Sequence, residues 1–360
     1  MLKSNSLHKQ ESAPYYIYAP RWINSSAGIK VLHFLCHALN QIGEEAYLIL
    51  SDPYFKSEPR INGRLNTPIL SSEQAKMHSK NGRNPIVIYS ETVDGNPLKS
   101  ENVVRYLLNY SGALGGSEVF PEFEYLISFS KNIALDYASK SGDRKTEVLF
   151  LPPIEANEFH LNLRKKPFQL VYAGKYRSFV GTPPAVGELP TIEIYRDSRK
   201  MQTRAEVIKL LSEASVLYCF ENSSIITESI LSGTPVLLVP NPFLGNVIAE
   251  HELGWGGVRF YGEVNALSEA KDSILDGVER YRESQNLFWV SLKNFVEKSQ
   301  RHFFSDSINR GIEIKDSRLI FLGHKFNLAV QIFQSKGAWV LFRVIIHYFR
   351  RRIGLKANMD

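Results

Sequence analysis

Two carboxylates frame a short polar loop in the segment ENSSIITESILSGTPVLLVP, residues 221–240. Six residues separate Glu221 from Glu228, and Ser223 and Ser224 lie between them. Backbone amides at the start of a helix bind phosphate or sugar groups, and a carboxylate accepts two hydrogen bonds from a vicinal diol such as a ribose. The segment is therefore interpreted in two ways: as a site for a phosphate, a sugar or the ribose of a nucleotide, or as a helix whose first turn simply gains from the charge of Glu228.

The elements around this loop would place it at the edge of a sheet. The stretches SVLYCF (215–220) and PVLLVP (235–240) are apolar, and a helix near 224–232 is closed by Gly233. Strands that are apolar throughout are typical of parallel sheets covered on both faces. Open α/β sheets bind ligands at the carboxyl ends of their strands, so we expect the loop to face a cleft.

The same alternation of apolar strands and amphipathic helices runs twice along the chain. It covers residues 15–151, where we expect a helix over ENVVRYLLNY (101–110), and it restarts after the proline-rich linker 152–167. Thr203 begins a helix with a capping box. We expect an α/β fold of two doubly wound, Rossmann-like domains facing across a cleft. The expected boundaries are 1–160 and 161–304 for the two domains and 305–360 for a tail.

Composition excludes several other classes of protein. The chain has 360 residues, 44% of them hydrophobic, and two cysteines, Cys36 and Cys219, that lie in apolar runs and are expected to be buried free thiols. The polar N-terminal stretch does not resemble a signal peptide, and no apolar run reaches the roughly 18 residues that span a bilayer. We therefore expect a cytoplasmic location.

The net charge of +6 is concentrated in the tail. From Arg318 to Asp360 the net charge is +7, whereas the other 317 residues together carry −1. Nucleic-acid enzymes usually spread basic groups over the catalytic face, so we expect no nucleic-acid partner. The segment 338–356 mixes Trp339 and Phe342 with a run of arginines, which indicates an interfacial helix on an anionic membrane, peripheral on the inner face. The alternative is a terminal helix packed on the protein.

Several of these segments resemble one family. ESILSGTPVLLV is similar to the donor-site segment of retaining group 1 nucleotide-sugar glycosyltransferases, which have the two-domain GT-B fold. SSAGIKVLHFLCHALNQIGEEAYLIL resembles the family's first loop, helix and second strand, and IVIYSETVDGNPLKSENVVRYLLNYSG resembles a segment of a bacterial polysaccharide-assembly branch. The resemblance covers roughly residues 15 to 300.

The resemblance implies an activity and its substrates. It implies transfer of a sugar, with retention, from a nucleotide-sugar donor (a UDP-sugar is favoured) to a growing cell-surface polysaccharide such as O-antigen or capsule on a lipid carrier. The N-terminal domain would bind the acceptor and the C-terminal domain the donor. No cofactor or metal is expected; His33 and His37 are four residues apart on one helix without a third ligand, so we expect them to be structural. Two rivals remain: another enzyme of the same fold, either a nucleotide-sugar epimerase or a phosphorylase, and an inactive GT-B protein that acts as a membrane-docked assembly partner.

The resemblance also implies roles for individual residues. Glu228 would hold the donor ribose. Glu221 would replace the family's first glutamate, although the family spacing is one residue longer, so a solvated loop glutamate is the alternative. Lys175 and Arg177 match the diphosphate clamp only loosely, and a solvated basic loop is the alternative. The remaining candidates are Ser223, Ser224, Thr227 and Arg196 for the donor, and Gly28 and Glu91, each with a plain structural alternative, for the acceptor.

Overall fold

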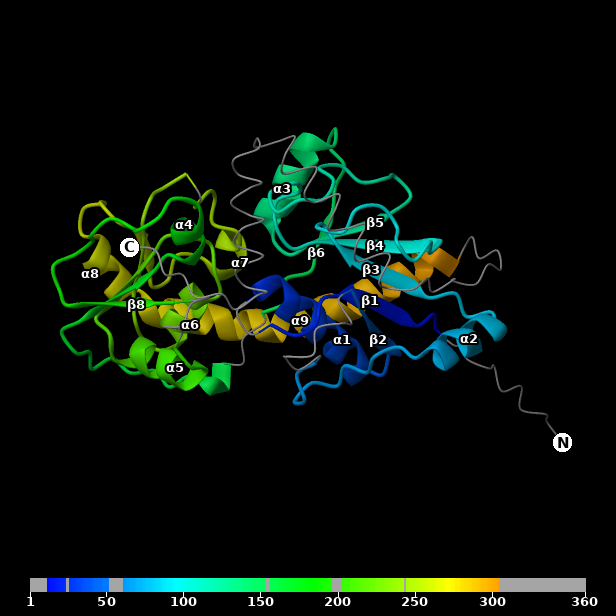
Figure 1. Ribbon diagram of the computed structural model, residues 1–360, viewed down its shortest axis with the longest axis horizontal. Coiled ribbons are helices and arrows are strands. Elements are labelled where there is room, and N and C mark those ends of the chain that lie inside the picture. Colours follow the sequence, from blue (N-terminus) through cyan, green and yellow to red (C-terminus); the bar gives the residue numbers. More distant parts are fainter. Residues whose placement is uncertain are drawn as a thin grey trace, which may run out of the picture.

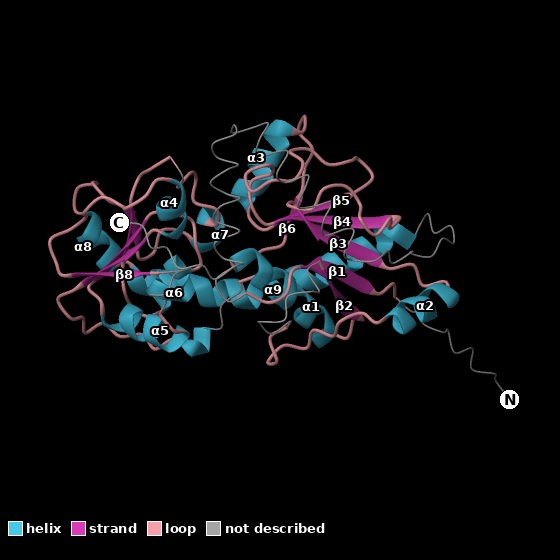
Figure 2. Ribbon diagram, viewed as in Figure 1, coloured by secondary structure: helices cyan, strands magenta, loops and turns pink. Residues whose placement is uncertain are grey.

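Two separate parallel β-sheets, each covered by helices, form the chain in its computed structural model (Figures 1 and 2). Every strand pair in both sheets is parallel. The expected α/β fold with two Rossmann-like domains is therefore confirmed. The structure describes residues 12–23, 26–51, 61–152, 156–195, 202–242 and 244–304.

The N-terminal sheet has six strands in the order β2-β1-β3-β4-β5-β6. The reversal of strand order beside β1 is the feature that opens a crevice at the carboxyl ends of a doubly wound sheet. The strands are β1 (Tyr15–Ala19), β2 (Ala46–Leu50), β3 (Ile86–Ser90), β4 (Asn102–Leu107), β5 (Tyr125–Ser128) and β6 (Glu147–Val148), and the helices are α1 (Ala27–Gln41), α2 (Ser72–Lys80) and α3 (Lys131–Lys140).

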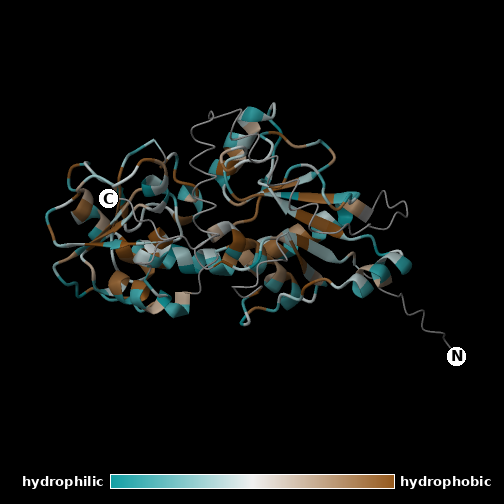
Figure 3. Cartoon of the chain, in the orientation of Figure 1, coloured by the Kyte–Doolittle hydropathy of each residue, from teal (hydrophilic) through white to brown (hydrophobic). Residues whose placement is uncertain are grey.

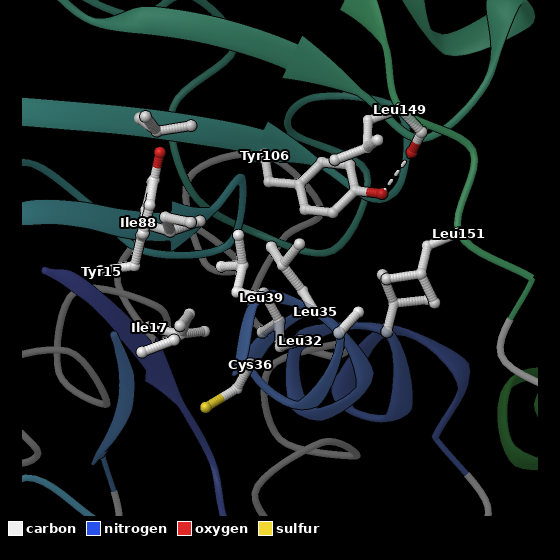
Figure 4. Packing of buried hydrophobic residues seen from close by; sticks show 14 of the residues in the cluster. Tyr15, Ile17, Leu32, Leu35, Cys36, Leu39, Ile88, Tyr106, Leu149 and Leu151 are labelled. Atoms are coloured by element: carbon white, nitrogen blue, oxygen red, sulfur yellow. Dashed lines mark hydrogen bonds between the residues drawn. The ribbon is translucent and has the colours of Figure 1, made fainter. Parts of the chain in front are cut away.

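Helix α1 packs its apolar face on this sheet. Leu35, Cys36 and Leu39 are fully buried against Ile17 and Ile88 of the central strands (Figure 4). Tight packing of branched and aromatic side chains is the main source of stability in such a core. The free thiol of Cys36 is buried here as expected, and that of Cys219 is buried in the second domain.

The expected helix over residues 101–110 was wrong, because this segment forms the central strand β4. Val103, Val104 and Tyr106 are fully buried between β3 and β5. β-Branched and aromatic residues favour a strand over a helix, and a short apolar run does not by itself separate the two. Helix α2 was not anticipated, although Ser71 and Gln74 form a capping box at its start.

The residue Arg105 projects from β4 into the protein interior and is fully buried. Its guanidinium donates to both carboxylate oxygens of Glu124 at 2.8 Å and to the carbonyls of Val93 and Gly95 at 2.6 and 2.8 Å. The ring of Phe120 lies 4.6 Å from the guanidinium carbon. Such a charge is tolerated inside a protein only when its donors are paired. Arg105 therefore fixes the loop that follows β3.

The C-terminal sheet has five strands in the order β11-β10-β9-β7-β8. Figure 3 shows hydrophobic residues, in brown, along the strands and on parts of the covering helices. The strands are β7 (Gln169–Tyr172), β8 (Thr191–Ile194), β9 (Val216–Cys219), β10 (Val236–Leu238) and β11 (Val258–Phe260), and the helices are α4 (Gly174–Phe179), α5 (Arg204–Glu213), α6 (Ile225–Leu231), α7 (Glu250–Leu253) and α8 (Ala266–Asp272). Thr203 caps α5 with the expected capping box.

One long helix, α9 (Ile274–Phe304), belongs to both domains and extends across both of them in Figure 1. Val278 and Tyr281 in its first half are part of the C-terminal core. Phe288, near its middle, and Phe295, in its second half, are part of the N-terminal core, together with β1 and α1. Besides the linker, α9 is thus a second covalent connection that crosses between the domains.

Candidate active site

A cavity of about 160 Å³ lies between the two domains, at the carboxyl ends of both sheets. Leu108 directly follows β4 and Phe129 directly follows β5, while Leu238 ends β10. This is the edge at which open α/β sheets bind ligands. The other lining residues are Ala27, Gly28 and Val31 of α1, Phe150, the segment 222–224, Ile226, Thr227 and Ile230 of α6, the segment 247–249, the segment 253–255, Val258, Gly277 and Tyr281.

Four of the residues predicted from the sequence meet in this cavity. Gly28 lies on its N-terminal-domain wall, whereas Ser223, Ser224 and Thr227 lie on its C-terminal-domain wall. A Cβ atom added at Gly28 would be 3.6 Å from Leu108, an ordinary contact, so packing alone does not require glycine there. The sequence therefore identified residues from both walls of one cavity.

Glu228 does not line the cavity, although it lies beside it in α6. Its side chain is buried, and its Oε2 accepts a hydrogen bond of 2.6 Å from Arg204 in α5. Its Oε1 lies 3.8 Å from the Nζ atom of Lys30 in α1, which belongs to the other domain. Arg204 also reaches Glu158, in the linker, at 3.2 Å. A ribose bound by Glu228 would have to share the carboxylate with these two cations.

Glu221 is fully buried, so it is not a solvated loop residue. Its Oε2 accepts a hydrogen bond of 2.6 Å from the backbone N–H of Lys175, in the first turn of α4. A carboxylate at this position satisfies an otherwise unpaired amide and interacts favourably with the helix dipole. The observed contact of Glu221 is thus with the start of α4.

The two basic residues of α4 have different surroundings. Arg177 forms a bidentate ion pair with Glu193 at 2.7 and 2.5 Å, and this carboxylate holds the pKa of Arg177 above its ordinary value. Residues two apart on a helix point to nearly opposite sides, so Lys175 and Arg177 cannot both face one ligand. Because Arg177 is paired with β8, Lys175 is the better candidate for a diphosphate. The third predicted cation, Arg196, lies outside the described residues.

Glu91 is buried at the end of β3. Burial raises the pKa of its carboxyl to about 7, an effect that the N–H of Leu108 partly offsets by donating to Oε2 at 2.9 Å. The carbonyl of Glu91 would lie 2.1 Å from a Cβ atom at Gly116, whose φ is +84°, so this glycine is required for the close approach. Glu91 therefore contacts Leu108, which lines the cavity, but does not line the cavity itself.

The remaining sequence signals are structural in the described part of the chain. His33 Nε2 lies 2.9 Å from the carbonyl oxygen of Pro20, and His37 Nδ1 accepts from the N–H of Asn66 at 2.9 Å. In the Ser-Gly-Thr-Pro turn, Gly233 has a φ of +82° and passes so close to the carbonyl of Asn162 that a Cβ atom would lie 2.5 Å from it. The glycine of this turn thus allows the backbone of the linker to lie directly against the second domain.

Polar contacts between the domains also lie on the side of the cavity away from Lys30. The N–H of Lys131, at the start of α3, donates to Glu252 of α7 at 2.8 Å. The side-chain amide of Asn132 donates to the carbonyl of Val247 at 2.7 Å. The cavity is therefore bounded by bridges from α1 to α6 and from α3 to the region of α7. Sequence reading missed these bridges and the residues Lys30 and Arg204, because long-range pairs have no signal in a single sequence.

Comparisons with known proteins give only weak similarities. No protein-family model matches the chain, and no curated protein matches its sequence. Among solved structures, it is similar to WaaG, a glycosyltransferase involved in lipopolysaccharide biosynthesis, at 11% identity and a TM-score of 0.43, covering 79% of this chain and 98% of that one. A glycosyltransferase from Rickettsia africae ESF-5 matches at 10% identity and a TM-score of 0.47, covering 82% and 100%. A putative UDP-N-acetylglucosamine 2-epimerase from Listeria monocytogenes matches at 11% identity and a TM-score of 0.38, covering 84% and 100%. At these values the similarities fix neither the family nor the activity of this chain.

The described residues contain no helix that is long and apolar enough to cross a membrane. The segment 338–356, for which we predict contact with a membrane surface, lies outside the described residues.

Proposed function

We propose that this protein is a glycosyltransferase that moves a sugar from a nucleotide donor, preferably a UDP-sugar, to a growing glycan on a lipid carrier. The observation that carries the proposal is the cavity onto which both parallel sheets direct the carboxyl ends of their strands. Residues predicted for the donor and for the acceptor line opposite walls of it. A reaction that joins two substrates needs this kind of arrangement, since holding both in place lowers the entropic barrier.

The chemistry proposed for the site is substitution with retention. The incoming hydroxyl and the leaving diphosphate share one face of the sugar, so the donor phosphate takes the proton of the acceptor. The protein then supplies position and charge: Glu228 would hold the ribose, and Lys175 would stabilise the diphosphate as its charge grows. None of these steps uses a metal, and we expect EDTA to leave the rate unchanged.

The proposal is tested directly with a panel of nucleotide sugars. We expect one of them to raise the melting temperature of the protein and to release nucleoside diphosphate slowly in the absence of acceptor. If no UDP-, GDP-, ADP- or TDP-sugar gives either a thermal shift or release of the diphosphate, the proposal is rejected. Interconversion of the donor without release of the diphosphate would identify an epimerase instead.

Replacing Lys175 by alanine should lower turnover more than it lowers affinity for the nucleoside. The reason is that a cation at the diphosphate acts mainly on charge that develops as the bond breaks. We expect a loss of about 100-fold in kcat, the size seen when one such stabilising group is removed. Single-turnover release of UDP, compared with calorimetric binding of uridine and UDP, measures both effects. Arg177→Ala serves as the matched variant, and equal loss of uridine and UDP affinity in Lys175→Ala would contradict the role.

The tail should dock the enzyme on an anionic membrane. A chain cut after Gly337 is expected to remain folded and to hydrolyse the donor, yet to lose flotation with vesicles that contain anionic lipid. Each basic group near such a surface contributes about 1 kcal/mol, and salt screens this attraction. Charge reversal at Arg350, Arg351 and Arg352 should give a milder, salt-sensitive loss. Undiminished flotation of the truncated chain would show that another surface contacts the membrane.

One observation favours the non-enzymatic rival. Glu228 and Arg177, the residues expected to hold ribose and diphosphate, both form ion pairs with other protein groups. A protein that keeps the GT-B fold only as an assembly partner could retain such pairs permanently. Nucleotide binding without any turnover on glycan extracts would support this rival.

A further inference from the structure

The walls of the interdomain cavity are predominantly hydrocarbon. The N-terminal domain contributes Leu108, Phe129 and Phe150, and the C-terminal domain contributes Leu253 and Trp255 among others. These residues lie at the edge at which open α/β sheets bind ligands, and an apolar lining is usual for such pockets. The hydrocarbon of this lining offers no hydrogen-bond partner to the hydroxyls of a sugar.

Few polar side chains in the lining are available to a ligand. The side-chain amide of Asn222 donates to the carbonyls of Leu244 and Asn246, and its oxygen accepts from the N–H of Ile248 at 3.3 Å. The indole N–H of Trp255 donates to Glu250 at 3.2 Å. The side-chain hydroxyls of Ser223, Ser224 and Thr227 remain on the α6 wall, and Tyr281 of α9 adds its phenol group to the lining.

This distribution opposes the binding of a sugar in the apolar part of the cavity. A hexose has hydroxyls on every side, and each hydroxyl that is buried without a hydrogen-bond partner opposes binding. A nucleobase needs partners along one edge and would compete for the same few hydroxyls. Hydrocarbon needs no partners, and its burial is favourable in proportion to the apolar area removed from water.

The volume fits a short hydrocarbon segment. An engineered cavity of about 150 Å³ lined by leucine, isoleucine and phenylalanine stays dry and binds benzene. A cavity of about 160 Å³ with similar walls therefore accepts a group of that size, such as the five-carbon unit of an isoprenoid.

We infer that the interdomain cavity binds hydrocarbon, and that the acceptor enters it with the first apolar unit of its lipid. The identity of the ligand as an acceptor rests on the proposed function, whereas the hydrocarbon pocket rests on the walls alone. The lipid is then held in the protein, and the hydroxyls of Ser223, Ser224 and Thr227 on the α6 wall are left to the donor. Its chain beyond this unit stays with the membrane.

Trp255 makes the inference testable by fluorescence, because bromine quenches an indole that it touches. The probe is 6-bromohexan-1-ol, added to the full-length protein. We expect quenching that saturates and that is reversed by geraniol, which contains no bromine. Trp255→Phe should lose this saturable component, whereas Trp289→Phe should keep it, since Trp289 lies on the outer surface of α9, 39% exposed.

A second variant tests the cavity without touching the reporter. Gly28→Leu places a side chain in the cavity, because Gly28 lines it and has room for a Cβ atom. We expect its apparent affinity for the probe to fall at least about tenfold, the effect of filling space that the ligand needs. The matched control is Gly63→Leu, since Gly63 is exposed and a Cβ atom there meets nothing within 4 Å. Circular dichroism melts confirm that both variants are folded.

The outcomes separate this inference from the proposed function. Quenching that does not saturate, or that survives in folded Gly28→Leu, overturns the hydrocarbon pocket. Displacement of the probe by uridine overturns it as well and identifies a nucleobase pocket. Saturable quenching without turnover of any nucleotide sugar supports the hydrocarbon pocket and contradicts the proposed transferase activity. Turnover of a nucleotide sugar without saturable quenching supports the transferase activity and contradicts the hydrocarbon pocket.

Discussion

Replacing Glu228 by alanine is expected to weaken the binding of UDP about 100-fold. Two hydrogen bonds from a ribose diol to a charged acceptor contribute about 3 kcal/mol together, which corresponds to roughly that factor in affinity. Titration calorimetry with UDP measures the loss directly. Glu269→Ala is the matched control, since Glu269 on α8 is an exposed glutamate that pairs with Arg259.

The same substitution should also lower stability, because it leaves Lys30 and Arg204 without their shared partner. The sequence alone predicts that a glutamate opening a helix at a cleft edge can be replaced at little structural cost. The buried ion pairs change that expectation. The variant Glu228→Gln combined with Lys30→Met balances the charge and separates the two effects. If the folded double variant binds UDP as tightly as the native chain, Glu228 does not hold the ribose.

Arg105→Met should destabilise the N-terminal domain by about 3–5 kcal/mol, the range for removal of one partner from a buried ion pair. The substitution leaves the carboxylate of Glu124 and the carbonyls of Val93 and Gly95 buried without their donor. It also frees the loop that positions Glu91. Urea unfolding followed by circular dichroism measures the change in the free energy of unfolding.

Two variants show whether the effect of Arg105 belongs to the buried pair. Adding Glu124→Met to Arg105→Met should restore much of the stability, because both charges are then absent. Lys298→Met removes one partner of the solvent-exposed pair with Glu147 and should cost less than about 1 kcal/mol. A loss in Arg105→Met as small as that of Lys298→Met would contradict the structural role.

The strands and their order of appearance were predictable because their apolar runs are bounded by turns. Segments such as YYIYA and VLYCF are short, continuous and buried on both faces, which is typical of parallel strands. The segment 101–110 was not predictable in this way. Its residues Val103 to Leu107 fit a strand or one face of a helix, and pairing with the preceding strand β3 and the following strand β5 decides the outcome.

The site was predictable where local sequence determines position. Gly28 lies in the first turn of α1, the helix after β1, and Ser223 lies in the loop after β9. The segments that follow the strands of a parallel sheet gather at one edge. This rule predicts that both residues lie at one cavity. The partners of Glu228 did not follow, because Lys30 lies almost 200 residues away and pairs with it only through the relative placement of two domains. The apolar character of the cavity could not be predicted either, because its walls come from separate segments between residues 27 and 281.

The helix that belongs to both cores limits how this molecule can open. The chain crosses between the domains at two places, the linker and the part of α9 between Tyr281 and Phe288. Two fixed crossings define a line, and a rotation about that line is the motion that stretches neither. Translation of one domain away from the other would pull α9 out of one of its cores. Opening of the cavity should therefore be a rotation of one domain about a single hinge axis. This rotation separates the α1–α6 contacts and the α3–α7 contacts, each by an amount that depends on its distance from the axis.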